Sequence, residues 1–177
     1  MYIREESECC ERICCGPNRS LTLHVHEGHD QTGNTIGKVH KTFGCSSCCC
    51  LRPSFVVTDG LDNRIGEIED PCRCCVLDQQ VKNVNGDTEF TASGACCQLG
   101  FCCPCIWDPR FAILDMNQTE VGAITKRFGG CGECMSGANN FDLLFPAGAD
   151  ETQKMLLLAV TMGLDLAYFE RQKGDSS

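Results

Sequence analysis

Cysteine is the residue type with the clearest capacity for chemistry, since 18 of the 177 residues are cysteines. Two Cys-x-x-Cys pairs, Cys45 with Cys48 and Cys131 with Cys134, have a spacing at which thiolates bind a structural zinc ion. Most other cysteines stand directly beside another one. Neighbouring side chains of an extended chain point to opposite faces, so such a pair cannot easily give both thiolates to one ion. A zinc site is therefore one of three interpretations.

The other two interpretations of the cysteines are burial as small apolar side chains and attachment of lipid. A disulfide framework would need an oxidising compartment. Residues 1–8 are polar and acidic, whereas a secretory signal is basic and then apolar. We therefore expect reduced thiols and a chain that stays in the cytoplasm.

Apart from the cysteines, the sequence contains no pattern that predicts enzymatic activity. The sequence contains no P-loop, no dinucleotide-binding glycine pattern, no nucleophile elbow and no HExxH motif. Its formal net charge of -9 argues against nucleic acid as a partner. The same charge repels an anionic membrane, so membrane contact would need calcium, acyl chains or an inserted segment.

Short strands and turns are predicted throughout the chain before residue 150. Residues 55–68 align without gaps on residues 111–124, with Phe, Asp, Gly and Ile in the same places, and residues 35–39 resemble the end of another copy. Asn85-Gly86 between two apolar runs is a strong hairpin signal. The sequence thus predicts about ten short antiparallel strands arranged as hairpins.

One long apolar run, Met155 to Phe169, follows the strands. It is apolar on nearly all sides, which places it inside protein or inside lipid. A membrane span needs roughly 18 or more apolar residues, and this run is shorter and contains Asp165. A closed barrel of many strands would leave a lumen that the helix fills. We predict a mostly β (α+β) fold, in which a single domain at 1–170 wraps an antiparallel barrel around a central helix at about 152–169, with a polar partner for Asp165 and a polar tail at 171–177.

Several stretches resemble the phospholipid scramblases: Cys9-Cys10 with Cys14-Cys15-Gly-Pro17, Gly44-Cys-Ser-Ser-Cys-Cys-Cys50, Val121-Gly-Ala-Ile-Thr-Lys126, and Asn139-Asn-Phe-Asp-Leu-Leu-Phe-Pro146 before the apolar helix. The resemblance covers nearly the whole chain. It implies a tubby-like fold, a twelve-stranded barrel around a C-terminal helix. The implied activity is calcium-activated, ATP-independent, bidirectional movement of phospholipids between bilayer leaflets. The alternative is a lipid-binding or protein-interaction module of the same fold that moves no lipid.

The resemblance implies a calcium segment before the helix, and here it is only partly kept. Family members begin it with Asp-x-Asp-Asn-Phe, whereas residues 137–141 read Gly-Ala-Asn-Asn-Phe. Calcium prefers carboxylate and carbonyl oxygens as ligands. The candidate positions are Asn139, Phe141, Leu143 and Phe145, with Asp142 and Asp150 nearby. The alternating apolar residues of the same segment also predict an ordinary strand.

The resemblance also implies covalent palmitate on Cys48, Cys49 and Cys50, together with Cys45. One acyl chain gives only marginal membrane binding, whereas two hold a domain at the bilayer. Cys102-Cys103-Pro104-Cys105 is a second candidate run. We expect a phospholipid membrane as partner and a location at the cytoplasmic face of the plasma membrane, with the C-terminal helix as a further candidate for lipid contact. Protein partners and self-association are further expectations.

The start of the chain departs from the family pattern. Relatives carry a Pro-rich segment and their first barrel strands ahead of the position where Tyr2 aligns, so the chain resembles an N-terminally shortened member. Without those strands, we expect an unpaired edge beside the strand that begins at Leu21. Pairing between two chains would close such an edge.

Overall fold

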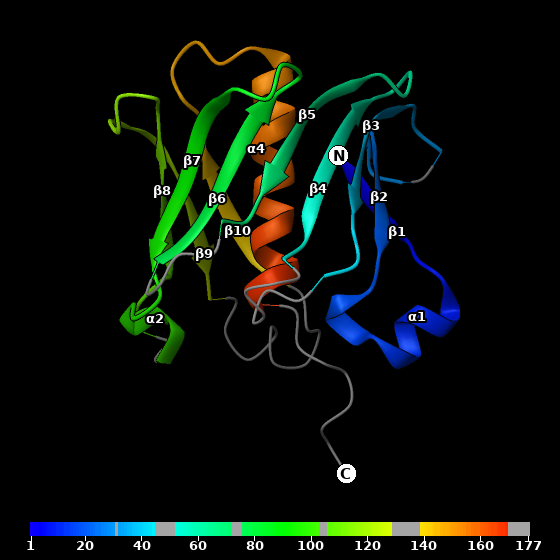
Figure 1. Cartoon of the computed structure of the whole chain (residues 1–177), viewed down its shortest axis with the longest axis horizontal. Helices are drawn as coiled ribbons and strands as arrows, with labels where there is room; N and C mark the ends of the chain where they lie inside the picture. Colours follow the sequence, from blue (N-terminus) through cyan, green and yellow to red (C-terminus); the bar gives the residue numbers. More distant parts are fainter. Residues whose placement is uncertain (31, 45–51, 72–75, 103–105, 129–138, 170–177) are drawn as a thin grey trace.

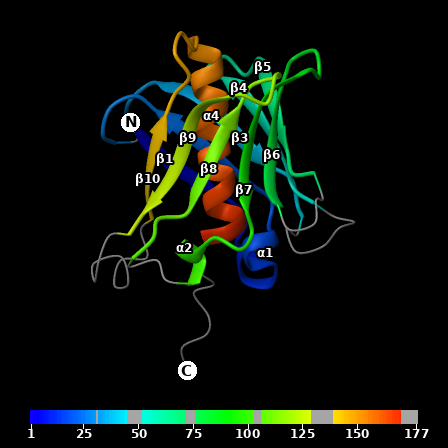
Figure 2. The same ribbon diagram turned by 90° about the vertical axis from the view of Figure 1, so that its left-hand side faces the viewer.

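The computed structural model describes residues 1–30, 32–44, 52–71, 76–102, 106–128 and 139–169. Within these ranges, ten antiparallel strands form one sheet in which each strand pairs with the next along the sequence. The sheet curves around a single long helix near the C-terminus (Figures 1 and 2). The strands are β1 (Tyr2–Glu6), β2 (Leu21–His26), β3 (Thr35–Lys41), β4 (Ser54–Asp59), β5 (Arg64–Glu69), β6 (Val76–Asn83), β7 (Thr88–Ala95), β8 (Arg110–Leu114), β9 (Glu120–Arg127) and β10 (Asn140–Leu144). The predicted fold class is confirmed.

The sheet is not closed in the described part of the chain. Pairing runs in sequence order from β1 to β10, so these two strands are its edges. The resemblance implied twelve strands and a closed barrel, and the described residues form ten strands and an open sheet. A closed barrel would require β1 to pair with β10, and no such pairing occurs within the described residues.

The predicted edge at Leu21 is wrong. β1 pairs with β2 from Tyr2 opposite His26 to Glu6 opposite Thr22, so β2 lies inside the sheet. The acidic composition of residues 1–8 concealed this strand. Its acids are in fact used for pairing, because Glu6 lies 2.9 Å from the Nε2 atom of His24 on β2.

The prediction of strands and turns throughout the first 150 residues is also wrong at two places. Short helices occur at α1 (Cys9–Cys14) and α2 (Leu99–Cys102), and a 3-10 turn covers Gly16–Asn18. α1 buries none of its residues. It therefore lacks the apolar periodicity by which a helix is predicted from sequence.

The two aligned sequence repeats form equivalent hairpins, β4–β5 and β8–β9. Phe55 and Phe111 begin the apolar side of each hairpin and are both fully buried. Asp59 and Asp115 occupy the same place in the two turns, where one carboxylate oxygen accepts hydrogen bonds from two backbone amides of the turn. The repeat therefore encodes both the buried side and the turn.

The central helix α4 (Glu151–Leu164) continues into a π-helical turn at Asp165–Phe169, close to the predicted 152–169. Asp150 and Gln153 form a capping box at its start. Leu156, Leu157, Val160 and Leu164 are buried among the inward-facing side chains of the sheet. Among the described residues, no helix combines the length and the apolarity that crossing a membrane requires.

The up-and-down order of the strands separates two kinds of connection. One set of connections, at 27–34, 60–63, 84–87, 115–119 and 145–150, follows strand ends on one side, which we call the turn end. The other set, at 7–20, 42–53, 70–75, 96–109 and 128–139, joins strand ends on the opposite side, where α4 finishes. All 18 cysteines of the sequence fall in this second set of connections. We call this side the cysteine end; α1 and α2 mark it at the bottom of Figure 1.

The first testable prediction concerns the helix as the core of the sheet. Leu157→Ala should lower the free energy of unfolding by about 2–5 kcal/mol, because a fully buried side chain leaves a cavity. Leu61→Ala, at a turn residue that is 84% exposed, is the control and should change it by less than about 0.5 kcal/mol. Urea unfolding followed by circular dichroism measures both. Equal losses would show that α4 is not the core.

Candidate functional site

The C-terminal end of the central helix is held by two polar contacts at the cysteine end of the sheet. In the first, the side-chain amide of Asn139 donates a 2.6 Å hydrogen bond to Asp165. Asn139 directly precedes β10, and Asp165 is the first residue of the π-helical turn. A half-buried carboxylate needs such a partner. The predicted polar partner of Asp165 is therefore present.

The second contact joins Arg52, Asp70 and Tyr168. Arg52 Nη1 donates to both carboxylate oxygens of Asp70 at 2.7 Å, and the Tyr168 hydroxyl lies 3.5 Å from one of them. Burial raises the pKa of the Asp70 carboxyl, although the Arg52 charge acts in the opposite direction. Burial, assisted by the Asp70 charge, raises the pKa of Tyr168 to about 12.

This three-residue cluster fixes the helix to two cysteine-bearing connections. Arg52 follows the run that ends at Cys50, and Asp70 stands two residues before Cys72. No local sequence pattern predicts the cluster, because its members are far apart in the chain and have no common motif. The sequence does contain one indication of a site here, because Arg52 and Asp70 are charged residues beside cysteine runs.

The predicted calcium residues are spread along β10 rather than gathered. Asp142 is exposed and accepts a 2.6 Å hydrogen bond from Arg127 Nε, while Asp150 caps α4 through a 2.7 Å bond from the Gln153 amide. Asn139 lies before β10 at the cysteine end, and Asp150 lies after it at the turn end. Calcium binding by this segment stays a prediction.

The apolar members of the predicted calcium set follow the alternation of a strand. Phe141 and Leu143 are half-buried and pack against the core, whereas Phe145 follows the strand and is exposed. Their side chains offer no oxygen ligand, so only their backbone carbonyls could contribute. In the described ranges, no group of three His, Cys, Asp or Glu side chains is close enough to hold a metal ion.

Most of the predicted cysteine sites lie outside the described residues. This applies to the lipidation candidates Cys45, Cys48, Cys49 and Cys50, to the zinc candidates Cys131 and Cys134, and to Cys103 and Cys105. Zinc binding and palmitoylation of these residues therefore stay predictions. Of the described cysteines, Cys9, Cys10, Cys14 and Cys97 are exposed, and Cys15 and Cys96 are partly exposed.

Comparison with known proteins identifies relatives over the whole domain. A family model described as Scramblase matches residues 1–171. Phospholipid scramblase 1 of Homo sapiens is 28% identical over 173 residues, which cover 96% of this chain and 52% of the relative. Phospholipid scramblase 2 of Bos taurus is 25% identical over 178 residues, covering 98% and 58% respectively. The chain thus spans about half the length of the curated relatives it matches. No solved structure gives a significant match.

The contact between Asn139 and Asp165 yields the second testable prediction. Asn139→Ala should lower the free energy of unfolding by about 1–3 kcal/mol, since it removes a hydrogen bond to a half-buried carboxylate. Asn140→Ala changes the exposed neighbour and should alter it by less than about 0.5 kcal/mol. Chemical unfolding of the two variants gives the comparison. Equal stabilities would contradict a role of Asn139 in holding the helix.

The environment of Tyr168 yields the third testable prediction. Because its folded pKa is raised from 10.0 to about 12, the folded protein keeps the phenol proton where the unfolded chain loses it. Tyr168 therefore lowers stability as the pH rises from 10 towards 12. Unfolding measurements between pH 9 and pH 11 should show a shallower fall for Tyr168→Phe than for the wild type, whereas Tyr2→Phe, the control on edge strand β1, should keep the steeper fall. Parallel curves for the wild type and Tyr168→Phe would contradict the burial of the phenol.

Proposed function

The chain belongs to the scramblase family, and on that premise we propose that it moves phospholipids between the two leaflets of a bilayer. The movement proposed is bidirectional and uses neither ATP nor covalent chemistry. The observation that carries this proposal is the family match over residues 1–171, which includes the central helix and the whole described sheet. The names of the curated relatives support phospholipid as the substrate.

The fold favours a lipid path along the open side of the sheet. α4 is not itself the path, because residues such as Leu157 and Val160 are completely buried. β1 and β10 are edge strands within the described residues, and an edge presents backbone groups on which a polar headgroup can form hydrogen bonds. Such groups are needed where a headgroup crosses roughly 30 Å of hydrocarbon.

We further propose that palmitate on Cys45 and Cys48 to Cys50 holds the chain at the cytoplasmic face of the plasma membrane. Acyl chains would offset the repulsion between an anionic bilayer and a chain with a net charge of -9. Cys50 is followed closely by Arg52, whose contact with Asp70 fixes one end of this connection. Acyl groups on it would therefore be attached close to the rigid sheet.

Calcium modulation is the third part of the proposal. Calcium at the segment 139–150 would need Asp142 to leave Arg127. Both side chains of that pair are more than half exposed, and an exposed pair contributes only about 0–1 kcal/mol. The rearrangement is therefore energetically small. Asn139 would have to exchange its contact with Asp165 for the ion.

A second candidate function is favoured by the burial of the helix. A helix enclosed by the sheet offers no polar path along which a lipid headgroup could move. Such burial is what we expect of a lipid-binding or protein-interaction module that moves no lipid. Such a module would bind vesicles and leave their leaflet asymmetry unchanged.

The fourth testable prediction separates these functions. The purified chain is reconstituted into liposomes that carry a fluorescent phospholipid in both leaflets. A membrane-impermeant quencher reaches only the outer-leaflet half of this probe if no lipid moves. The chain should raise the quenched fraction above one half, and calcium should increase it further. Binding without this increase would support the module and overturn lipid movement.

The calcium segment can be tested in the same liposomes. Asp142→Asn should weaken the calcium response, because it removes a candidate carboxylate ligand. Asp62→Asn is the matched control, since the Asp62 side chain is 65% exposed, close to the 63% of Asp142, and forms a 2.7 Å ion pair with Lys38 on a different hairpin. Equal responses of the two variants would exclude Asp142 as a ligand.

A further inference from the structure

We propose that the exposed face of α1, formed by Cys9, Cys10, Ile13 and Cys14, is an acylation site that places the cysteine end of the molecule on the membrane. The cysteines of this site are separate from the run at 45–50. The inference rests on the proposed membrane function and adds to it a modification site and an orientation. The surface it docks on is a phospholipid bilayer.

The two ends of the sheet differ in composition in a way that favours one orientation. The described cysteines Cys9, Cys10, Cys14, Cys15, Cys96 and Cys97 lie at the cysteine end, and the connections of the turn end contain no cysteine in their sequence. The acidic residues show the opposite bias. The turn-end connections carry six acids and no Lys or Arg, namely Glu27, Asp30, Asp62, Asp87, Asp115 and Asp150.

The connections of the cysteine end are nearly neutral. Their described residues include four acids and three basic residues, namely Glu8, Glu11, Asp70 and Asp108 with Arg12, Arg19 and Arg52. An anionic bilayer therefore repels the turn end more strongly than the cysteine end, even though Lys38 of β3 offsets the charge of Asp62. Approach to a membrane surface favours the cysteine end.

α1 presents thiols and an apolar side chain to solvent on one face. Cys10, Ile13 and Cys14 follow the i, i+3, i+4 spacing that places residues on the same side of a helix, and Cys9 lies four residues before Ile13. All three cysteines are exposed, and Ile13 is 78% exposed. Ile13 is therefore not part of the hydrophobic core, since α1 buries none of its residues.

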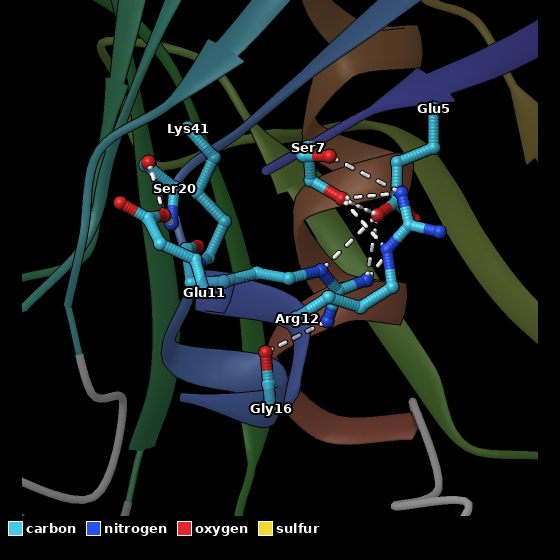
Figure 3. A network of polar contacts seen from close by, with 8 residues as sticks. Glu5, Ser7, Glu11, Arg12, Gly16, Ser20 and Lys41 are labelled. Atoms are coloured by element: carbon cyan, nitrogen blue, oxygen red, sulfur yellow. Dashed lines mark hydrogen bonds and ion pairs between the residues drawn. The ribbon is translucent and has the colours of Figure 1, made fainter. Parts of the chain in front are cut away.

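The other face of α1 is fixed to the sheet by polar contacts (Figure 3). The Glu11 carboxylate accepts hydrogen bonds from the backbone amide and the hydroxyl of Ser20, at 2.9 and 2.5 Å. Arg12 donates to the Ser7 hydroxyl at 3.0 Å. These bonds tie both ends of the β1–β2 connection to the helix, so the cysteine face points away from the sheet.

A second pair of contacts anchors this connection to the sheet itself. Arg19 binds the Glu5 carboxylate of β1 through two nitrogens, at 2.9 to 3.1 Å. The ammonium group of Lys41, a buried residue of β3, donates a 2.7 Å hydrogen bond to the Arg19 carbonyl. α1 is therefore a fixed platform, on which attached acyl chains would orient the whole sheet.

The β7–β8 connection adds exposed apolar side chains to the same end. Leu99, Ile106 and Trp107 are all more than half exposed there. Tryptophan is favoured at the boundary between lipid headgroups and hydrocarbon. Exposed apolar residues also occur at the turn end, but there they stand among the six acids that an anionic surface repels.

Acylation of α1 is a simple thioester exchange with a long-chain fatty acyl-CoA as donor. The cysteine sulfur attacks the acyl carbonyl carbon, a new sulfur–carbon bond forms, and the bond between that carbon and the CoA sulfur breaks. CoA leaves as its thiol with the proton that the cysteine gives up. Two or more chains on one small helix exceed the single chain that gives only marginal membrane binding.

The site can be tested by counting thioesters on the full chain expressed in cultured cells. Hydroxylamine cleaves the thioesters, and a polyethylene-glycol maleimide then adds one mass step for each cysteine released. The variant in which Cys9, Cys10 and Cys14 are all replaced by Ser should lose at least two mass steps relative to the wild type. Cys15→Ser, at the partly exposed residue that directly follows α1, is the control and should lose none. An unchanged count in the triple variant would overturn the acylation site.

The orientation has its own matched pair of variants. Ile13→Asp and Leu61→Asp each place one acid at a strongly exposed apolar position, 78% and 84% exposed, at opposite ends of the sheet. Ile13→Asp should reduce the membrane-bound fraction of the cell lysate at least twofold, whereas Leu61→Asp should leave it unchanged. Equal effects, or a larger effect of Leu61→Asp, would overturn the orientation.

These outcomes are distinct from failure of the proposed function. Loss of mass steps in the triple variant, together with absence of lipid movement by the wild type in liposomes, would keep the acylation site and remove scrambling. Lipid movement by a wild type that carries no thioester on α1 would keep the proposed scrambling function and remove the acylation site.

Discussion

Burial of one helix that is apolar on nearly all sides is the constraint on which the rest of this structure depends. α4 can be enclosed only if strands surround it, and each strand must then direct alternate side chains inward. The consequences reach the backbone. A Cβ atom on Gly66 of β5 would lie 2.7 Å from Leu156 and 2.4 Å from the Lys82 carbonyl, so this strand approaches the helix as closely as glycine allows. The capping box at Asp150 fixes where the helix enters the sheet.

The same arrangement divides the molecule into two unlike ends. Because every strand pairs with its sequence neighbour, the chain reverses direction at each step, and alternate connections fall at alternate ends. Tight turns at one end need polar residues such as Asp59 and Asp115, whose carboxylates bind the turn amides. The connections at the other end are free of that requirement. They can hold cysteines without disturbing the core, because the core is built from the strands and α4.

The sequence predicted the structure where a local pattern of residues corresponds to one structural element. The hairpin repeat and the all-round apolar run predicted the sheet, its core helix and the need of Asp165 for a partner. It was uninformative where side chains serve by pairing across the fold. β1 has an acidic sequence and is stabilised by partners on and before β2, and α1 has no buried face at all. The cluster of Arg52, Asp70 and Tyr168 depends on the packing of distant segments, which no local spacing records.

The polar contacts that hold the C-terminal end of the central helix lie at the cysteine end, and this position connects the proposed membrane contact with the core. Asp165 opens a π-helical turn, a form of helix that is rare and often marks functional positions. Its partner Asn139 belongs to the segment that resembles a calcium site. An ion bound there would compete with Asp165 for the Asn139 side chain, and the carboxylate would then need water or lipid headgroups as its partner. The first residue of the proposed calcium segment, the end of the helix and the proposed membrane surface therefore lie at the same end of the fold.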